Sequence, residues 1–203
     1  MDSTLNNKVA IFDLGNVVLD WNVSQILKSL NLEPEEENLL REELFSHQVW
    51  LDLDHGRETE ASAVIKVCER SVLERSAVEK AIFAAKDSLS PISETISLMQ
   101  DLSNNSIEMY CLSNMPRETY DHIKNFELFK LFNGIIISGI EGCSKPNDDI
   151  FHLIIRRFEL EPRNTLFIDD SLPNINAAER LGINGFHFKR SDSCYANIRK
   201  LLL

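Results

Sequence analysis

The chain has 203 residues, of which 43% are hydrophobic and 26% charged, which suits one large domain or a core with a smaller insert. Its net charge of −11 disfavours nucleic acid or an anionic membrane as the main partner, although a bound divalent cation could still attract a small anionic substrate. No apolar run approaches the roughly 20 residues that cross a bilayer, and residues 1–7 are polar without a signal-peptide pattern, so we expect a frayed N-terminus. The four cysteines form no Cys-x-x-Cys pair, so we expect a reduced, cytoplasmic setting.

Short apolar runs along the chain predict strands, and helix-like runs follow the last four of them. The strand-like runs are 8–12, 107–112, 134–138, 164–168 and 184–188. Strands that alternate with helices are typical of a parallel sheet with helices on both faces. We therefore predict an α/β fold.

The interval between the first two strands breaks this rhythm. It contains no convincing strand from about residue 20 to 88, and its Leu-, Glu- and Ala-rich segments predict helices at about 23–30, 34–49, 59–71 and 75–86. We expect a core domain of residues 1–18 and 89–203, with residues 19–88 forming a helical cap domain. An insertion directly after the first strand would stand over the carboxyl edge of the sheet, where it could close over a site.

Polar residues follow the strands at the carboxyl ends, where open α/β sheets bind ligands. They are Asp13 after the first strand, Ser113-Asn114 after the second, Lys145 after the third and its loop, and Asp169-Asp170 after the fourth. Each alone has an ordinary explanation, such as a turn or a helix cap. All of them in this order on one sheet edge favour a site.

These residue types suit phosphoryl transfer. A carboxylate such as Asp13 can attack phosphorus and form an acyl phosphate. Hydroxyl, amide and backbone N–H groups can hold the phosphoryl oxygens, and a lysine can neutralise the charge that accumulates there. A second group of carboxylates can hold Mg²⁺ against the nucleophile and the phosphate.

The same residues resemble the motifs of the haloacid dehalogenase-like (HAD) hydrolase superfamily over nearly the whole chain. The motifs are Phe12-Asp13-Leu14-Gly15-Asn16-Val17, Leu112-Ser113-Asn114, Lys145-Pro146-Asn147 with Ile150-Phe151, and Phe167-Ile168-Asp169-Asp170-Ser171 with Asn174 downstream. The resemblance implies a Rossmann-like core with a helical cap of the first type. It also implies a Mg²⁺-dependent phosphatase of small phosphorylated metabolites. We expect a monomer or a homodimer, and the sequence does not choose between them.

The resemblance assigns roles by position. Asp13 is the expected nucleophile that becomes aspartyl-phosphate, and Lys145 is expected to bridge this nucleophile and the phosphate. Ser113 and Asn114 are expected to bind the phosphoryl group. The expected metal ligands are Asp13, the carbonyl of Gly15, Asp170 and Asp169, and which of the last two binds the metal directly stays open.

Gly15 departs from the family pattern. Most phosphatases of the superfamily carry there an aspartate that protonates the leaving group, a contribution of about 10²–10⁴-fold. The substrate could have a good leaving group, as in a sugar 1-phosphate, an acyl phosphate or an aryl phosphate. A cap residue could instead supply the proton, with Asp54 and His55 as candidates and Asp20 as a weaker one. Finally, the chemistry could be dehalogenation or phosphonate cleavage, although the acidic pair argues against a metal-independent dehalogenase.

The stretch around Asp13 is also similar to bacterial sugar-phosphate phosphatases that act on glucose 1-phosphate. An anomeric phosphate has a relatively stable leaving group, so we expect a sugar phosphate such as a sugar 1-phosphate. The cap residues that could contact the substrate are Trp21, Asp54, His55 and Arg57, and Trp50 could line the same pocket. A non-catalytic regulatory protein on this fold is the alternative from another class, supported only by Gly15.

Overall fold

The computed structural model describes residues 8–203, and the expectation of a frayed end at residues 1–7 lies outside this range. Five parallel strands form one sheet in the order β5-β4-β1-β6-β7. They are β1 (Val9–Phe12), β4 (Glu108–Ser113), β5 (Gly134–Ile137), β6 (Thr165–Asp169) and β7 (Asn184–His187). The predicted α/β fold with a parallel sheet is confirmed.

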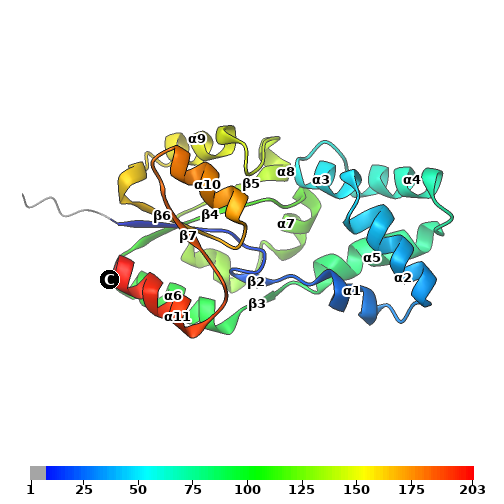
Figure 1. The fold of residues 1–203 in the computed structure, drawn as a ribbon, viewed down its shortest axis with the longest axis horizontal. Coiled ribbons are helices and arrows are strands. Elements are labelled where there is room, and N and C mark those ends of the chain that lie inside the picture. Colours follow the sequence, from blue (N-terminus) through cyan, green and yellow to red (C-terminus); the bar gives the residue numbers. More distant parts are fainter. Residues whose placement is uncertain (1–7) are drawn as a thin grey trace, which may run out of the picture.

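Helices cover both faces of this sheet because side chains alternate along each strand. In β1, Ala10 and Phe12 face one apolar cluster, and Val9 and Ile11 face another. Figure 1 shows α9 and α10 on one side of the sheet, and α6 and α11 on the other. The helices are α6 (Ser93–Asn104), α7 (Arg117–Ile123), α8 (Ser138–Glu141), α9 (Asp148–Arg157), α10 (Leu172–Arg180) and α11 (Asp192–Leu202), with 3₁₀ turns at Glu127–Leu131 and Pro162–Asn164.

A separate group of helices extends beyond one end of the sheet (Figure 1). They are α1 (Val23–Ser29), α2 (Pro34–Leu40), α3 (Gln48–Asp54), α4 (Glu60–Arg70) and α5 (Arg75–Asp87). Buried residues such as Leu27, Leu53 and Val78 form an apolar cluster of their own there. We call α1–α5, together with the residues that join them to β2 and β3, the cap. Two short antiparallel strands, β2 (Leu19–Asp20) and β3 (Ser90–Pro91), carry the chain out of the sheet region and back.

The single helix expected over residues 34–49 is wrong. After α2 the chain forms a π-helical turn at Arg41–Phe45, breaks at Ser46, and starts α3 after His47. The ring Nδ1 of His47 accepts a hydrogen bond from the N–H of Val49 at 3.1 Å and so caps α3. The break lets Leu44 of the turn and Val49 and Leu53 of α3 point into the same cluster. Within residues 8–203, no helix is both long and apolar enough to span a membrane.

The cap touches the core tightly where α3 ends. Gly56 has a φ of +68°, and a Cβ added to it would lie 2.5 Å from the carbonyl oxygen of Gly139 in α8. The hydroxyl of Ser138 donates to the carbonyl oxygen of Asp54 and accepts from the N–H of Met115 at 2.9 Å. The end of α3 is therefore bonded through one side chain to the loop after β4.

Gly56→Ala should destabilise the protein more than Gly142→Ala does. Both glycines have a positive φ, +68° and +73°, where an alanine costs about 1–2 kcal/mol, but only Gly56 would also collide with backbone. We expect the free energy of unfolding to fall by about 1–3 kcal/mol more in Gly56→Ala than in Gly142→Ala. Urea denaturation of the two variants measures the difference, and equal losses would contradict close docking of the cap.

Candidate active site

The polar residues at the strand ends meet at one edge of the sheet. The central strand β1 lies between β4 and β6, with Phe12 opposite both Cys111 and Ile168. Asp13, Ser113 and Asp169 consequently end three adjacent strands at similar heights. The backbone N–H of Asp13 continues the ladder by donating to the carbonyl oxygen of Ile168 at 3.0 Å.

Lys145 lies buried between two carboxylates. Its Nζ is 2.9 Å from Asp13 Oδ1 and 2.7 Å from Asp169 Oδ2, and only 1% of its side chain is exposed. The ammonium group also lies 5.5 Å from the centre of the Phe167 ring. A buried charge needs such partners, because desolvating it alone would be very unfavourable. Lys145 thus ties the loop after α8 to the ends of β1 and β6.

The two neighbouring acids on β6 have different surroundings. Asp169 is fully buried and accepts hydrogen bonds from Lys145, from the N–H of Ser171 at 2.8 Å and from the amide of Asn174 at 3.0 Å. Asp170 is partly exposed and accepts from the side-chain amide of Asn16 at 3.2 Å. Asp170 therefore keeps more capacity for a further ligand than Asp169 does.

The three carboxyl groups form a cluster that suits a hard cation. Asp13, Asp169 and Asp170 offer oxygens that all lie within 4.8 Å of one another. Carboxylate oxygens are the ligands that Mg²⁺ prefers in proteins. The donor set therefore fits a magnesium ion, with one lysine compensating only part of the negative charge.

Burial dominates the ionisation of this cluster. It raises the pKa of Asp13 to about 7, although the nearby Lys145 opposes the shift. Burial alone would lower the pKa of Lys145, but the carboxylates of Asp13 and Asp169 outweigh it and raise the value above its ordinary range. The ammonium group therefore stays charged, and a bound divalent cation would favour the ionised form of Asp13.

Ser113 and Asn114 have separate geometries. The Asn114 amide donates to the carbonyl oxygen of Lys145 at 2.8 Å, and its Oδ1 accepts from the N–H of Lys145 at 2.9 Å. The side chain of Asn114 is thus occupied in holding the lysine loop. The Ser113 side chain is 1% exposed and, within residues 8–203, makes no hydrogen bond to protein, although it lines a pocket. Its hydroxyl is available to a ligand.

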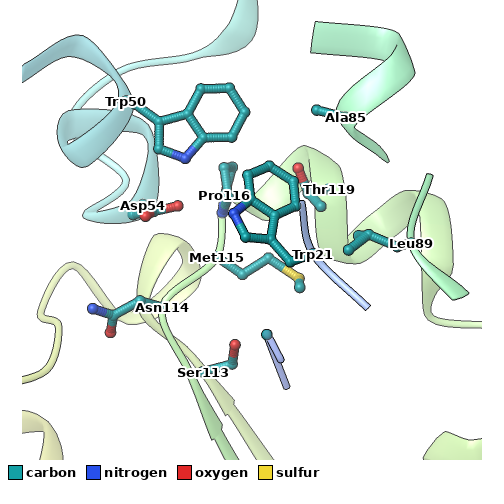
Figure 2. A pocket seen from close by; sticks show the side chains of 11 residues that line it. Trp21, Trp50, Asp54, Ala85, Leu89, Ser113, Asn114, Met115, Pro116 and Thr119 are labelled. Carbon is teal, nitrogen blue, oxygen red and sulfur yellow. The ribbon is translucent and has the colours of Figure 1, made fainter. Parts of the chain in front are cut away.

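An apolar pocket lies between this edge of the sheet and the cap (Figure 2). The indole rings of Trp21 and Trp50 are 5.6 Å apart, and in the view of Figure 2 Trp21 lies between Trp50 and Ser113. The lining residues are Gly15, Trp21, Trp50, Asp54, Ala85, Leu89, Ser113, Asn114, Met115, Pro116 and Thr119. Apolar residues line both sides of the pocket, with Ser113 and Asn114 contributed by the sheet edge and Asp54 by the end of α3.

The cap residues expected to contact substrate do not all reach this pocket. Asp54 and Trp21 line it, as does Trp50. The side chain of Arg57 is 62% exposed and lies 3.5 Å from Asp52, and His55 bonds to core and cap atoms outside the lining. Sequence reasoning missed Met115 and Pro116, which directly follow Asn114 in the sequence, and also Ala85, Leu89 and Thr119. The last three lie outside the motifs, and only the fold brings them to the pocket.

Lys145→Met should destabilise the protein strongly, because it leaves Asp13 and Asp169 buried without their cation. Breaking a buried pair in this way typically costs about 3–5 kcal/mol. A carboxyl whose pKa is raised on folding loses stabilisation as pH rises, so the deficit should be larger at mildly alkaline than at mildly acidic pH. Chemical denaturation measures both effects.

Lys130→Met is the matched control, because Lys130 pairs with Glu127 on the surface with 73% of its side chain exposed. Such pairs contribute about 0–1 kcal/mol. If Lys145→Met lowers the free energy of unfolding no more than the control does, the ion pairs of Lys145 with Asp13 and Asp169 do not stabilise this edge of the sheet.

Comparisons with known proteins agree with this fold. The chain is 24% identical over 200 residues to a sesquiterpene phosphatase of Aspergillus oryzae, covering 96% of each chain. It superposes on a HAD-like family hydrolase from Porphyromonas gingivalis with a TM-score of 0.75 at 24% identity, covering 96% of this chain and 97% of the other. A Bacteroides thetaiotaomicron HAD family enzyme in complex with magnesium and inorganic phosphate gives a TM-score of 0.72 at 21% identity, covering 91% and 96%.

A family model agrees with these matches and confirms the expected superfamily. The model for haloacid dehalogenase-like hydrolases matches residues 7–182, which is most of the chain and includes all four motifs. The chain belongs to the haloacid dehalogenase-like hydrolase family.

Proposed function

We propose that the protein hydrolyses a small phosphate monoester with the help of Mg²⁺, through an aspartyl-phosphate on Asp13. The observation that carries this proposal is the cluster of Asp13, Asp169 and Asp170 joined to Lys145, beside a pocket that contains the free hydroxyl of Ser113. A nucleophile, a cation-binding acid group and phosphate-binding groups are the parts that phosphoryl transfer needs.

The metal would be held by Asp13, Asp170 and the carbonyl of Gly15. Asp169 already accepts hydrogen bonds at both carboxylate oxygens, so it is better suited to orient Lys145 than to bind the ion directly. A bound Mg²⁺ would withdraw charge from the phosphoryl oxygens and offset the repulsion between them and Asp13. The magnesium and phosphate in the Bacteroides enzyme support this choice of ion.

The remaining residues would position the phosphoryl group. The Ser113 hydroxyl donates to one phosphoryl oxygen, and the Lys145 ammonium lies between the nucleophile and the phosphate. Asn114 acts through the lysine loop, which its amide clamps on both backbone groups. Asp13 Oδ1 already accepts bonds from Lys145 and from the N–H of Leu14 at 2.7 Å, so Oδ2 is the oxygen free to attack phosphorus.

The pocket lining bears on the alcohol part of the substrate. The sugar 1-phosphate suggested by Gly15 stays our prediction, since two indole rings can cover the apolar face of a sugar. A second candidate is the monophosphate of a hydrophobic alcohol, which the apolar lining favours and which is consistent with the similarity to a sesquiterpene phosphatase. The cytoplasmic location and the monomeric or homodimeric state, like the core and cap boundaries at residues 18–19 and 88–89, also stay predictions.

Asp13→Asn should abolish hydrolysis of p-nitrophenyl phosphate while the protein remains folded, because the amide cannot attack phosphorus. Release of nitrophenol measures turnover, and circular dichroism checks the fold. Chelation of Mg²⁺ should stop the wild-type reaction as well, and added Mg²⁺ should restore it. Turnover that survives both changes would point instead to metal-independent chemistry such as dehalogenation.

A substrate panel should separate the two candidate alcohols. If the apolar lining selects the substrate, an isoprenoid monophosphate should have a kcat/KM at least about tenfold higher than glucose 1-phosphate, since burying a few CH₂ groups is worth a few kcal/mol. Trp50→Ala should remove most of that preference. The reverse order, with glucose 1-phosphate preferred, would favour the sugar-phosphate prediction. No turnover of any phosphate ester in the presence of Mg²⁺ would support a non-catalytic protein.

A further inference from the structure

The site lacks a proton donor on the sheet side of the pocket. Gly15 has no side chain, Ser113 is a weak acid, and Lys145 is engaged by two carboxylates. Nevertheless, hydrolysis of an unactivated ester needs a proton on the departing alcohol. The donor must therefore reach the pocket from another element.

Asp54 lies where such a donor is needed. It ends α3 and lines the same pocket as Gly15 and Ser113, and Figure 2 shows its carboxyl group beside the pocket below the ring of Trp50. Within residues 8–203, its side-chain oxygens make no hydrogen bond to protein, whereas its backbone carbonyl is bonded to Ser138. The carboxyl group is thus free while its backbone is fixed.

The local structure holds Asp54 firmly. Ser138 links its carbonyl to the N–H of Met115, two residues after Ser113, and Gly56 packs so closely against Gly139 that an added Cβ would lie 2.5 Å from the carbonyl oxygen of Gly139. Next along the chain, Nε2 of His55 lies 2.5 Å from the hydroxyl of Ser144. The end of α3 is therefore attached to the loop that follows Ser113 and to the loop that carries Lys145.

The other candidates for this role are engaged elsewhere. Nδ1 of His55 lies 2.5 Å from the carbonyl oxygen of Leu51, so it must donate there, and Nε2 faces Ser144. Asp20 is 2.9 Å from Arg190, and neither it nor His55 lines the pocket. Of these candidates, Asp54 is the acid that lines the pocket and whose carboxyl group has no hydrogen-bond partner within residues 8–203.

We propose, on the basis of the function proposed above, that Asp54 is the general acid and base of the reaction and replaces the carboxylate missing at residue 15. As Asp13 forms its bond to phosphorus, the bond from phosphorus to the alcohol oxygen breaks and that oxygen takes the proton from the Asp54 carboxyl group. Asp54 then takes a proton from water while the water oxygen attacks phosphorus, which releases inorganic phosphate and the Asp13 carboxylate.

The environment of Asp54 is consistent with this use. Burial, followed by the nearby charge of Asp13, raises the pKa of its carboxyl group to about 7, with Lys145 opposing. The charged groups that shift this pKa are Asp13 and Lys145 from the core. A group of this acidity can give and take a proton near neutral pH.

The test compares two esters of similar shape, p-nitrophenyl phosphate and 4-nitrobenzyl phosphate, in the Mg²⁺-loaded protein. Nitrophenolate leaves without a proton, whereas the nitrobenzyl alkoxide needs one. Asp54→Asn should lower kcat/KM for 4-nitrobenzyl phosphate by about 10²–10⁴-fold and for p-nitrophenyl phosphate by less than about tenfold. A burst of nitrophenol should also appear, because water attack on the aspartyl-phosphate loses its base.

Two further variants sharpen the result. Asp52→Asn is the matched control, since Asp52 is on the same helix but outside the pocket and should leave the ratio of the two esters unchanged. In the Asp54→Asn background, Gly15→Asp should restore activity toward 4-nitrobenzyl phosphate, because a Cβ at Gly15 meets no atom within 4 Å.

Equal losses on both esters, or no loss on either, would overturn the role of Asp54. Asp54→Ala is used in the same way if the amide variant does not fold. The proposed function is tested separately. If Asp13→Asn still hydrolyses p-nitrophenyl phosphate, Asp13 is not the nucleophile, and the role proposed for Asp54 is wrong as well.

Discussion

The ion cluster around Lys145 is the constraint on which the rest of the structure depends. An ammonium group with 1% of its side chain exposed can exist at the sheet edge only because Asp13 and Asp169 flank it at 2.9 and 2.7 Å. Those two residues belong to neighbouring strands, so β1 and β6 must end at the same height. Asn114 fixes the backbone of the lysine, and Asn174 fixes Asp169. The geometry of the edge follows from satisfying these buried charges.

The cap and the sheet edge contribute different chemistry to one pocket. The edge provides charge and hydrogen-bonding groups, which suit a phosphoryl group and a cation. The cap provides Trp21, Trp50 and Ala85, which suit the carbon part of a substrate, and it provides Asp54. Contacts with Ser138 and Gly139 fix the cap against the loop that follows Ser113, and the bond from His55 to Ser144 fixes it against the loop that carries Lys145. In the proposed mechanism this division lets the cap complete a site that lacks an acid at Gly15.

The sequence predicted a large part of this arrangement. Short apolar runs predicted five parallel strands, and each strand of the confirmed sheet begins and ends within one residue of its predicted run. Continuous apolar runs, buried on both faces of the sheet, and strand–helix alternation are local signals, so they can be read from the sequence. The expected helix over 34–49 was wrong because its break at Ser46 depends on how Leu44 and Val49 share one apolar cluster. Tertiary packing outweighed helical periodicity there.

By itself, the sequence determined which residues gather at the carboxyl edge, because parallel strands all end at the same edge and the polar residues directly follow the apolar runs. Only the tertiary structure decided which cap residues reach the pocket. Asp54, His55 and Arg57 are close together in the chain and equally polar, yet one faces the pocket, one bonds to Ser144 and one faces solvent. Their directions depend on where α3 ends against α8, and that contact joins segments about 80 residues apart, as in the bond between Ser138 and Asp54 with a separation of 84. A contact at that range leaves no trace in the local pattern.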